Sequence, residues 1–199
     1  MRPGKIGFLA VLTGLCVGLV ACGQTPARQE RNEIQPGGPG ISQVEVQRQD
    51  AITRWANDYC IAVGSLVDGL ATMPTVDPST PRRAVQTSSD LLGSMIGGLD
   101  KAVTGLRALP PAPVPEGDAA RAGTVTRLTG VRDRAAAAKK RLDDAGDAPT
   151  ISQQTLGEAH GPLDEVSKLD LLAGFDAPDL QFAVAHAPVC QQLTVRATS

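Results

Sequence analysis

Two histidines and four cysteines are the residues of this 199-residue chain that are best suited to metal binding or nucleophilic chemistry. His186 and Cys190 are four residues apart, so on a helix both side chains lie on one face. Together with Cys60, they could supply thiolate and imidazole ligands for a metal ion. The same three residues could also form a Cys–His pair for redox or nucleophilic chemistry.

A second pair with this spacing is His160 and Asp164. Two ligands do not complete a metal site, and Gly161-Pro162 disturbs a helix between them, so we interpret this pair as exposed polar residues. The sequence has no phosphate-binding glycine loop, zinc-protease motif or calcium loop. We therefore predict no catalytic, cofactor-binding or metal-binding residues and no enzyme activity.

Cys22 follows a segment with the composition of a secretory signal peptide. Two basic residues lie among the first five, and residues 6–21 carry no charge. This segment is short for a permanent membrane span, which needs roughly 20 apolar residues. Its end, Leu19-Val20-Ala21-Cys22, resembles the lipobox of bacterial lipoproteins. The resemblance implies removal of residues 1–21 and attachment of a diacylglyceryl group, with acyl chains such as palmitate, to the Cys22 thiol.

Once Cys16 is removed with the signal peptide and Cys22 is acylated, Cys60 and Cys190 are the cysteines that remain. Disulfides form and persist in oxidising extracytoplasmic compartments. We therefore predict a Cys60–Cys190 disulfide that joins the first and last helices. Such a bond removes both thiolates. The disulfide and a metal-binding or redox site formed by Cys60, His186 and Cys190 are therefore alternative uses of the same two cysteines.

Charge and aromatic content narrow the classes of ligand. Without Arg2 and Lys5, the basic residues fall from 19 to 17 against 21 acidic ones, which gives the mature chain a net charge of −4. This balance gives no general preference for nucleic acid. Aromatic residues make up 3% of the chain, so extended stacking platforms for single-stranded nucleic acid or carbohydrate are not expected.

Composition divides the mature chain into two parts. Residues 22–42 are polar and rich in Gly and Pro, which is typical of a flexible tether. About 20 residues of random coil reach roughly 25 Å, so the domain should lie close to the membrane. Residues 43–199 form the predicted helical domain, because apolar side chains there repeat at intervals of three and four.

Prolines and caps divide this domain into helices. A first helix begins near Ser42, and Asp77-Pro78-Ser79-Thr80-Pro81 separates it from the second, with Thr80 as N-cap and Pro81 at the first helical position. Prolines in residues 110–115 end the second helix, and a third covers about 116–145. A fourth helical stretch bends near Gly161-Pro162, and its apolar residues are Leu156, Ala159, Leu163 and Val166. The last predicted helix begins near Pro178, and Pro188 lies inside it or ends it.

Sustained alternation of apolar and polar residues, the pattern of strands, is missing from the sequence. We therefore predict an all-α, monomeric, antiparallel bundle of four main helices, the fourth split in two, tied by one disulfide. Glycines recur inside these helices. We favour close helix packing as their role, and the alternative is a loose bundle that opens for a ligand.

The predicted third helix is rich in basic residues. At 100° per residue, two rows of cations lie on either side of the apolar seam of this helix. Such residues are usually solvated or paired with neighbouring helices, and the alternative is contact with anionic lipid or wall polymer. The cations are Arg121, Arg132 and Lys139 in one row, Arg127, Arg134 and Arg141 in the other, and Lys140.

The chain as a whole is similar to the small secreted helical lipoproteins of actinobacteria. The resemblance depends on the lipobox, on Trp55-x-x-x-Tyr59-Cys60 and on Ala187-Pro188-Val189-Cys190. It implies a lipid-anchored protein on the extracytoplasmic face of the cell membrane. We predict a non-catalytic module that binds an envelope protein, wall polymer or small apolar ligand, with a metal-binding or redox protein as the alternative.

Overall fold

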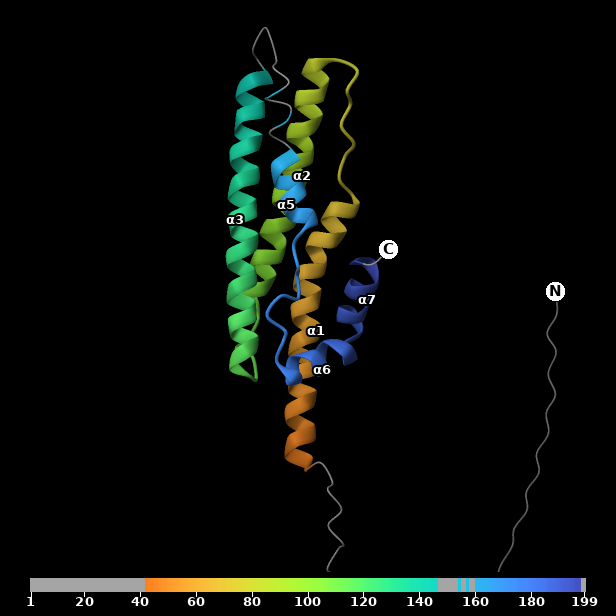
Figure 1. The fold of residues 1–199 in the computed structure, drawn as a ribbon, viewed down its shortest axis with the longest axis vertical. Coiled ribbons are helices and arrows are strands. Elements are labelled where there is room, and N and C mark those ends of the chain that lie inside the picture. The colour runs from red at the N-terminus through yellow and green to blue at the C-terminus, as the bar shows by residue number, and fades with distance from the viewer. Residues whose placement is uncertain (1–41, 147–153, 155–156, 158–159, 198–199) are drawn as a thin grey trace, which may run out of the picture. The chain divides into compact units, whose positions relative to one another are not determined.

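The computed structural model describes residues 42–146, 154, 157 and 160–197, and the described part of the chain contains helices and no strands (Figure 1). The predicted signal peptide, the lipidated Cys22 and the tether up to residue 41 lie outside the described residues. The helices are α1 (Gln43–Ala71), α2 (Pro81–Ala108), α3 (Pro115–Gly146), α5 (His160–Ser167), α6 (Pro178–His186) and α7 (Pro188–Ala197).

The boundaries of the long helices follow from local chemistry. The Ser42 hydroxyl accepts a hydrogen bond from the Glu45 amide at 3.2 Å, and Thr80 does the same for the Arg83 amide at 3.2 Å. These bonds satisfy amides that have no partner inside the helix. Pro81 and Pro115 are the first residues of α2 and α3, where a missing N–H costs nothing. The predicted N-cap at Thr80, the predicted start of a helix near Ser42 and the proline boundaries of α2 and α3 are confirmed.

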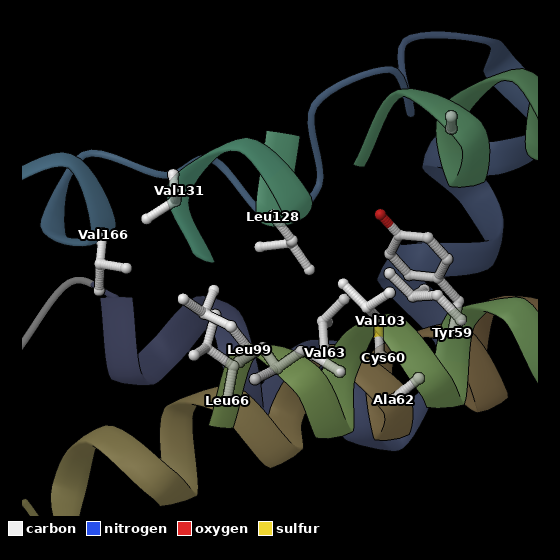
Figure 2. Close-up of a cluster of buried hydrophobic side chains, with 14 of the residues drawn as sticks. Tyr59, Cys60, Ala62, Val63, Leu66, Leu99, Val103, Leu128, Val131 and Val166 are labelled. Carbon is white, nitrogen blue, oxygen red and sulfur yellow. The ribbon is translucent and has the colours of Figure 1, made fainter. Parts of the chain in front are cut away.

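The core lies along the seam between α1, α2 and α3. Figure 2 shows Leu128 and Val131 of α3 directed toward Leu66 and Leu99, which come from α1 and α2. The buried side chains repeat at the predicted helical intervals. The fully enclosed large ones are Tyr59, Ile52, Leu66, Leu92, Met95, Leu99, Leu106, Leu128, Leu142, Leu180, Val63 and Val85.

Small residues bring α1 and α2 close together. A Cβ atom built on Gly105 would lie 3.0 Å from the Cβ of Ala62, and one built on Gly69 would lie 3.4 Å from the Cα of Gly98. At Gly105 a side chain would be crowded against Ala62, and at Gly69 it would touch the backbone of α2. The glycines on this helix face thus serve close packing, the role favoured by the sequence.

Three short helices occupy the positions that a single fourth helix would fill. In the described residues, α5 packs on α3, whereas α6 and α7 pack on α1 (Figure 1). Gly161 and Pro162 lie in the first turn of α5, and the residues directly before it, which the predicted bend would involve, lie outside the described residues. Pro178 and Pro188 each begin a helix, because proline cannot donate the hydrogen bond needed to continue one. Leu156 and Ala159 lie outside the described residues.

The prediction of an all-α bundle tied by one disulfide is confirmed. The first and last helices are neighbours, as the prediction required. Within the described part, the fourth element is divided into more pieces than expected.

Candidate functional site

Cys60 of α1 and Cys190 of α7 form the predicted disulfide. Their Cα atoms are 5.2 Å apart, and both residues are 0% exposed. Cys190 Sγ also lies 3.2 Å from the Ala56 carbonyl oxygen, so α7 sits directly against the backbone of α1. Because the two sulfur atoms are bonded to each other, neither is a thiolate ligand in this state. The metal-binding or redox alternative therefore concerns the reduced protein.

His186 does not face the disulfide as a metal ligand would. Its ring is exposed and stacks on Phe182 with the centroids 3.9 Å apart, and Nδ1 lies 2.8 Å from the Phe182 carbonyl oxygen. His160 and Asp164 are exposed on α5. Within the residues that the structure describes, no three His, Cys, Asp or Glu side chains gather as a possible metal site.

The helix that carries Cys190 also contacts α1 through noncovalent groups. Leu193 is buried near Gly64 of α1, and the Val189 amide donates to Asn57 Oδ1 at 3.1 Å. Burial of one leucine contributes about 1.5–3 kcal/mol. Fixing the backbone of each residue costs about 1–2 kcal/mol, and an isolated helix of 10 residues is marginal in water. The covalent bond is thus the main restraint on α7.

The first row of cations on α3 contacts α2 and the loop that follows it. Each guanidinium or ammonium group reaches an acceptor on that neighbour. The contacts are Arg121 to the carbonyl oxygens of Leu109 and Pro110 (2.7 and 3.1 Å), Arg132 to Asp100 (3.1 Å) and Lys139 to Ser89 (2.9 Å). These cations therefore join α3 to α2 along one side of the apolar seam.

The second row contacts the other neighbours of α3. Arg127 donates to Thr124 at 2.8 Å and to the Ala173 carbonyl oxygen at 3.4 Å, and Arg134 forms an ion pair with Glu165 of α5 at 2.6 Å. Arg141 and Arg134 line a surface groove of about 330 Å³ beside α5. Lys140, whose side chain is 74% exposed, pairs with Asp144 of the same helix at 2.7 Å.

Sequence alone left two roles open for these cations, pairing with neighbours or contact with an anionic surface. The described geometry supplies partners on adjacent elements for members of both rows. Contact with lipid or wall polymer stays a prediction, and it would have to use groups that already stabilise the bundle.

A polar cluster links α2 and α3 beside a surface cavity of about 340 Å³. Asp143 accepts hydrogen bonds from the Ser89 hydroxyl and from Lys139, the latter at 2.8 Å. The bond from Lys139, then that from Ser89, lowers the pKa of Asp143. A carboxylate with a lowered pKa is a weak base, and the ammonium group neutralises it. The three groups thus satisfy one another and are poorly arranged to make Ser89 a nucleophile.

The predicted Trp55-x-x-x-Tyr59-Cys60 segment contributes to an aromatic cluster. The rings of Tyr59 and Phe175 are 4.7 Å apart, and those of Trp55 and Tyr59 are 5.7 Å apart. The Tyr59 hydroxyl lies 2.8 Å from Thr124 Oγ1 and donates to the Leu171 carbonyl oxygen at 3.0 Å. Burial raises the pKa of Tyr59, opposed by the bond to Thr124. This cluster holds the segment between α5 and α6 against α1 and α3.

Sequence analysis missed the partners in this cluster. Thr124 lies 65 residues from Tyr59 along the chain, and Leu171 takes part through its backbone, which carries no sequence signal. The sequence does indicate that Thr124 is buried, because it lies four residues before Leu128 and thus on the apolar face of α3.

Among the described helices, none is long and apolar enough to cross a lipid bilayer. The chain matches no protein-family model, no curated protein and no solved structure at a significant level.

Proposed function

We propose that this chain is a membrane-anchored extracytoplasmic lipoprotein that displays a non-catalytic helical binding or scaffolding module. The observation that carries the proposal is the buried Cys60–Cys190 disulfide, since such bonds persist in oxidising compartments. A lipobox-like sequence, Leu19-Val20-Ala21-Cys22, precedes the domain and supplies a means of attachment.

The anchoring follows from acyl-chain energetics. One acyl chain gives only reversible membrane attachment, with about 0.8 kcal/mol for each buried methylene group. Two or three chains on Cys22 would hold the domain durably without a transmembrane helix. The tether, residues 22–42, would then keep the bundle within roughly 25 Å of the bilayer surface.

The module is proposed to act by binding or scaffolding. The cations described above contact acceptors on neighbouring elements, the aromatic rings pack on one another, and the two cysteines are bonded to each other. This arrangement supports a rigid platform, with an envelope protein, a wall polymer or a small apolar molecule as the classes of ligand.

The test is expression of the full chain in a bacterial host fed with an alkyne-labelled fatty acid. We expect wild type to carry the label, to fractionate with membranes and to have Cys22 as its first residue by mass spectrometry. Cys22→Ala should lose the label and remain unprocessed. Cys16→Ala is the matched control, since it removes the other cysteine of the N-terminal segment and should be labelled like wild type.

An unacylated wild-type N-terminus would overturn the lipoprotein proposal. Loss of label from Cys16→Ala as well as Cys22→Ala would count against Cys22 as the acylated residue. For the metal-binding alternative, which concerns the reduced protein, we expect Zn²⁺ added after reduction of the disulfide to leave the melting temperature unchanged. A rise that disappears in His186→Ala would favour that alternative.

A further inference from the structure

We propose that the Cys60–Cys190 disulfide controls the docking of α7 alone, so that a dithiol reductant releases α7 from α1 while α1, α2 and α3 stay folded. This inference concerns the folded domain and does not depend on lipid attachment. It makes the C-terminal helix of the protein a redox-dependent element.

Few side chains of α7 are buried. Its main contacts are with α1 and α6. Among its residues 188–195, only Cys190 and Leu193 are buried, and Val189 is half-buried. The others are exposed: Pro188, Gln191, Gln192, Thr194 and Val195. With 10 residues, this helix is too short to be stable in isolation.

The core between α1, α2 and α3 is held by contacts that do not involve α7. Leu66, Leu99 and Leu128 are each at most 1% exposed and pack against one another across α1, α2 and α3 (Figure 2). The neighbouring α6 has attachments of its own. It buries Leu180, and its Asp179 forms an ion pair with Arg48 of α1 at 2.5 Å. Release of α7 therefore leaves these contacts in place.

A reductant must reach the sulfur atoms of the disulfide. A thiolate of the reductant attacks one sulfur to form a mixed disulfide, and the second thiol of the reductant resolves it. Two electrons and two protons reach Cys60 and Cys190, and the reductant is oxidised to a disulfide. Because both cysteines are fully buried, attack requires a local opening in which the rest of α7 lifts from α1 while Cys190 is still bonded to Cys60. The rate of reduction therefore measures the opening of α7.

Hydrogen exchange provides the first test, with the full chain purified in detergent. Oxidised protein is compared with protein reduced by dithiothreitol and with Cys60→Ala/Cys190→Ala. We expect amides of α7 to exchange at least about tenfold faster in both disulfide-free forms, with those of α1, α2 and α3 nearly unchanged. Unchanged protection of α7 would overturn the proposal. Loss of protection throughout α1, α2 and α3 would also overturn it, including the case in which the double variant fails to fold.

Reduction kinetics provide the second test. Leu193→Ala removes the main apolar contact of α7 and should speed native-state reduction by about tenfold or more. Gln192→Ala is the matched control, because Gln192 is exposed on the same helix and should change the rate less than about twofold. Equal rates for Leu193→Ala and wild type would show that reduction does not proceed through opening of α7, and the proposal would fail.

Discussion

A methyl group added at Gly105 meets a different environment from one added at Gly97. At Gly105 the new Cβ would lie 3.0 Å from the Cβ of Ala62, whereas at Gly97 it would meet no atom within 4 Å. Both residues lie inside α2. They therefore separate the cost of crowding between helices from the intrinsic preference of alanine for helix.

We expect Gly97→Ala to raise the free energy of unfolding by up to about 1 kcal/mol, because alanine favours helix over glycine. Gly105→Ala should lose this gain or become destabilising, since α1 and α2 must separate to admit the methyl group. Urea unfolding followed by circular dichroism measures both. Equal stabilisation by the two substitutions would contradict the close helix contact.

Tyr59 is the second residue with a specific prediction. Tyr59→Phe removes the hydroxyl that contacts the buried Thr124 side chain and the carbonyl oxygen of the half-buried Leu171. We expect a loss of about 1–3 kcal/mol in the free energy of unfolding. Hydrogen exchange should also rise in the segment that contains Leu171. If neither the free energy of unfolding nor the hydrogen exchange changes, this hydroxyl does not have the proposed role.

The raised pKa of Tyr59 makes the free energy of unfolding depend on pH. Burial raises this pKa above its usual value near 10, so the folded protein holds the phenol proton more tightly than the unfolded chain. The resulting stabilisation is complete below about pH 10 and is lost as the pH rises through the folded pKa. Tyr59 is the only tyrosine, so tyrosinate absorbance reports it alone. Titration at the usual value in the folded protein would contradict the burial.

At the scale of elements, α3 is the scaffold on which its neighbours pack. Its apolar seam packs in the core, and its two rows of cations contact α2 on one side and α5 with the following segment on the other. Exposed ion pairs contribute little individually. Several pairs along one helix still favour one register of its neighbours over others.

Charge reversal on α3 tests this role. Arg134→Glu would place a carboxylate against Glu165 and should increase hydrogen exchange in α5 by about twofold or more. Lys140→Glu also reverses a cation of α3, but its partner Asp144 belongs to the same helix, so exchange in α5 should not change. Equal effects of the two reversals would mean that α5 responds to net charge rather than to its own ion pair.

At the scale of the whole molecule, the disulfide closes most of the domain into a loop. Cys60 and Cys190 are 130 positions apart, and the chain-entropy model assigns roughly 5 kcal/mol to a loop of that size. That figure requires both cysteines to belong to one cooperative unit. If α7 opens separately, reduction removes less than this from the stability of the core.

We therefore expect reduction to lower the free energy of unfolding of α1, α2 and α3 by less than about 5 kcal/mol. Guanidinium unfolding of the oxidised and reduced protein, followed by tryptophan fluorescence, measures this difference. Trp55 is the only tryptophan, and it lies in α1 within the core. A full loss of about 5 kcal/mol would show that α7 and the core unfold together.

The sequence by itself determined the long helices, their caps and their buried faces. These properties are local, because a capping hydroxyl acts over three residues and an apolar stripe over one or two turns. The disulfide was also predictable, since the predicted removal of Cys16 and the predicted acylation of Cys22 leave one possible pair.

Only the tertiary structure decided which groups meet across the bundle. The pairing of Arg134 with Glu165 and of Tyr59 with Thr124 depends on the relative register of helices that are separated by loops. The division of the fourth element into α5, α6 and α7 was equally hidden, because a proline can bend a helix, end it or begin another. Each outcome depends on which packing against α1 and α3 buries more apolar surface, and that comparison is not local in sequence.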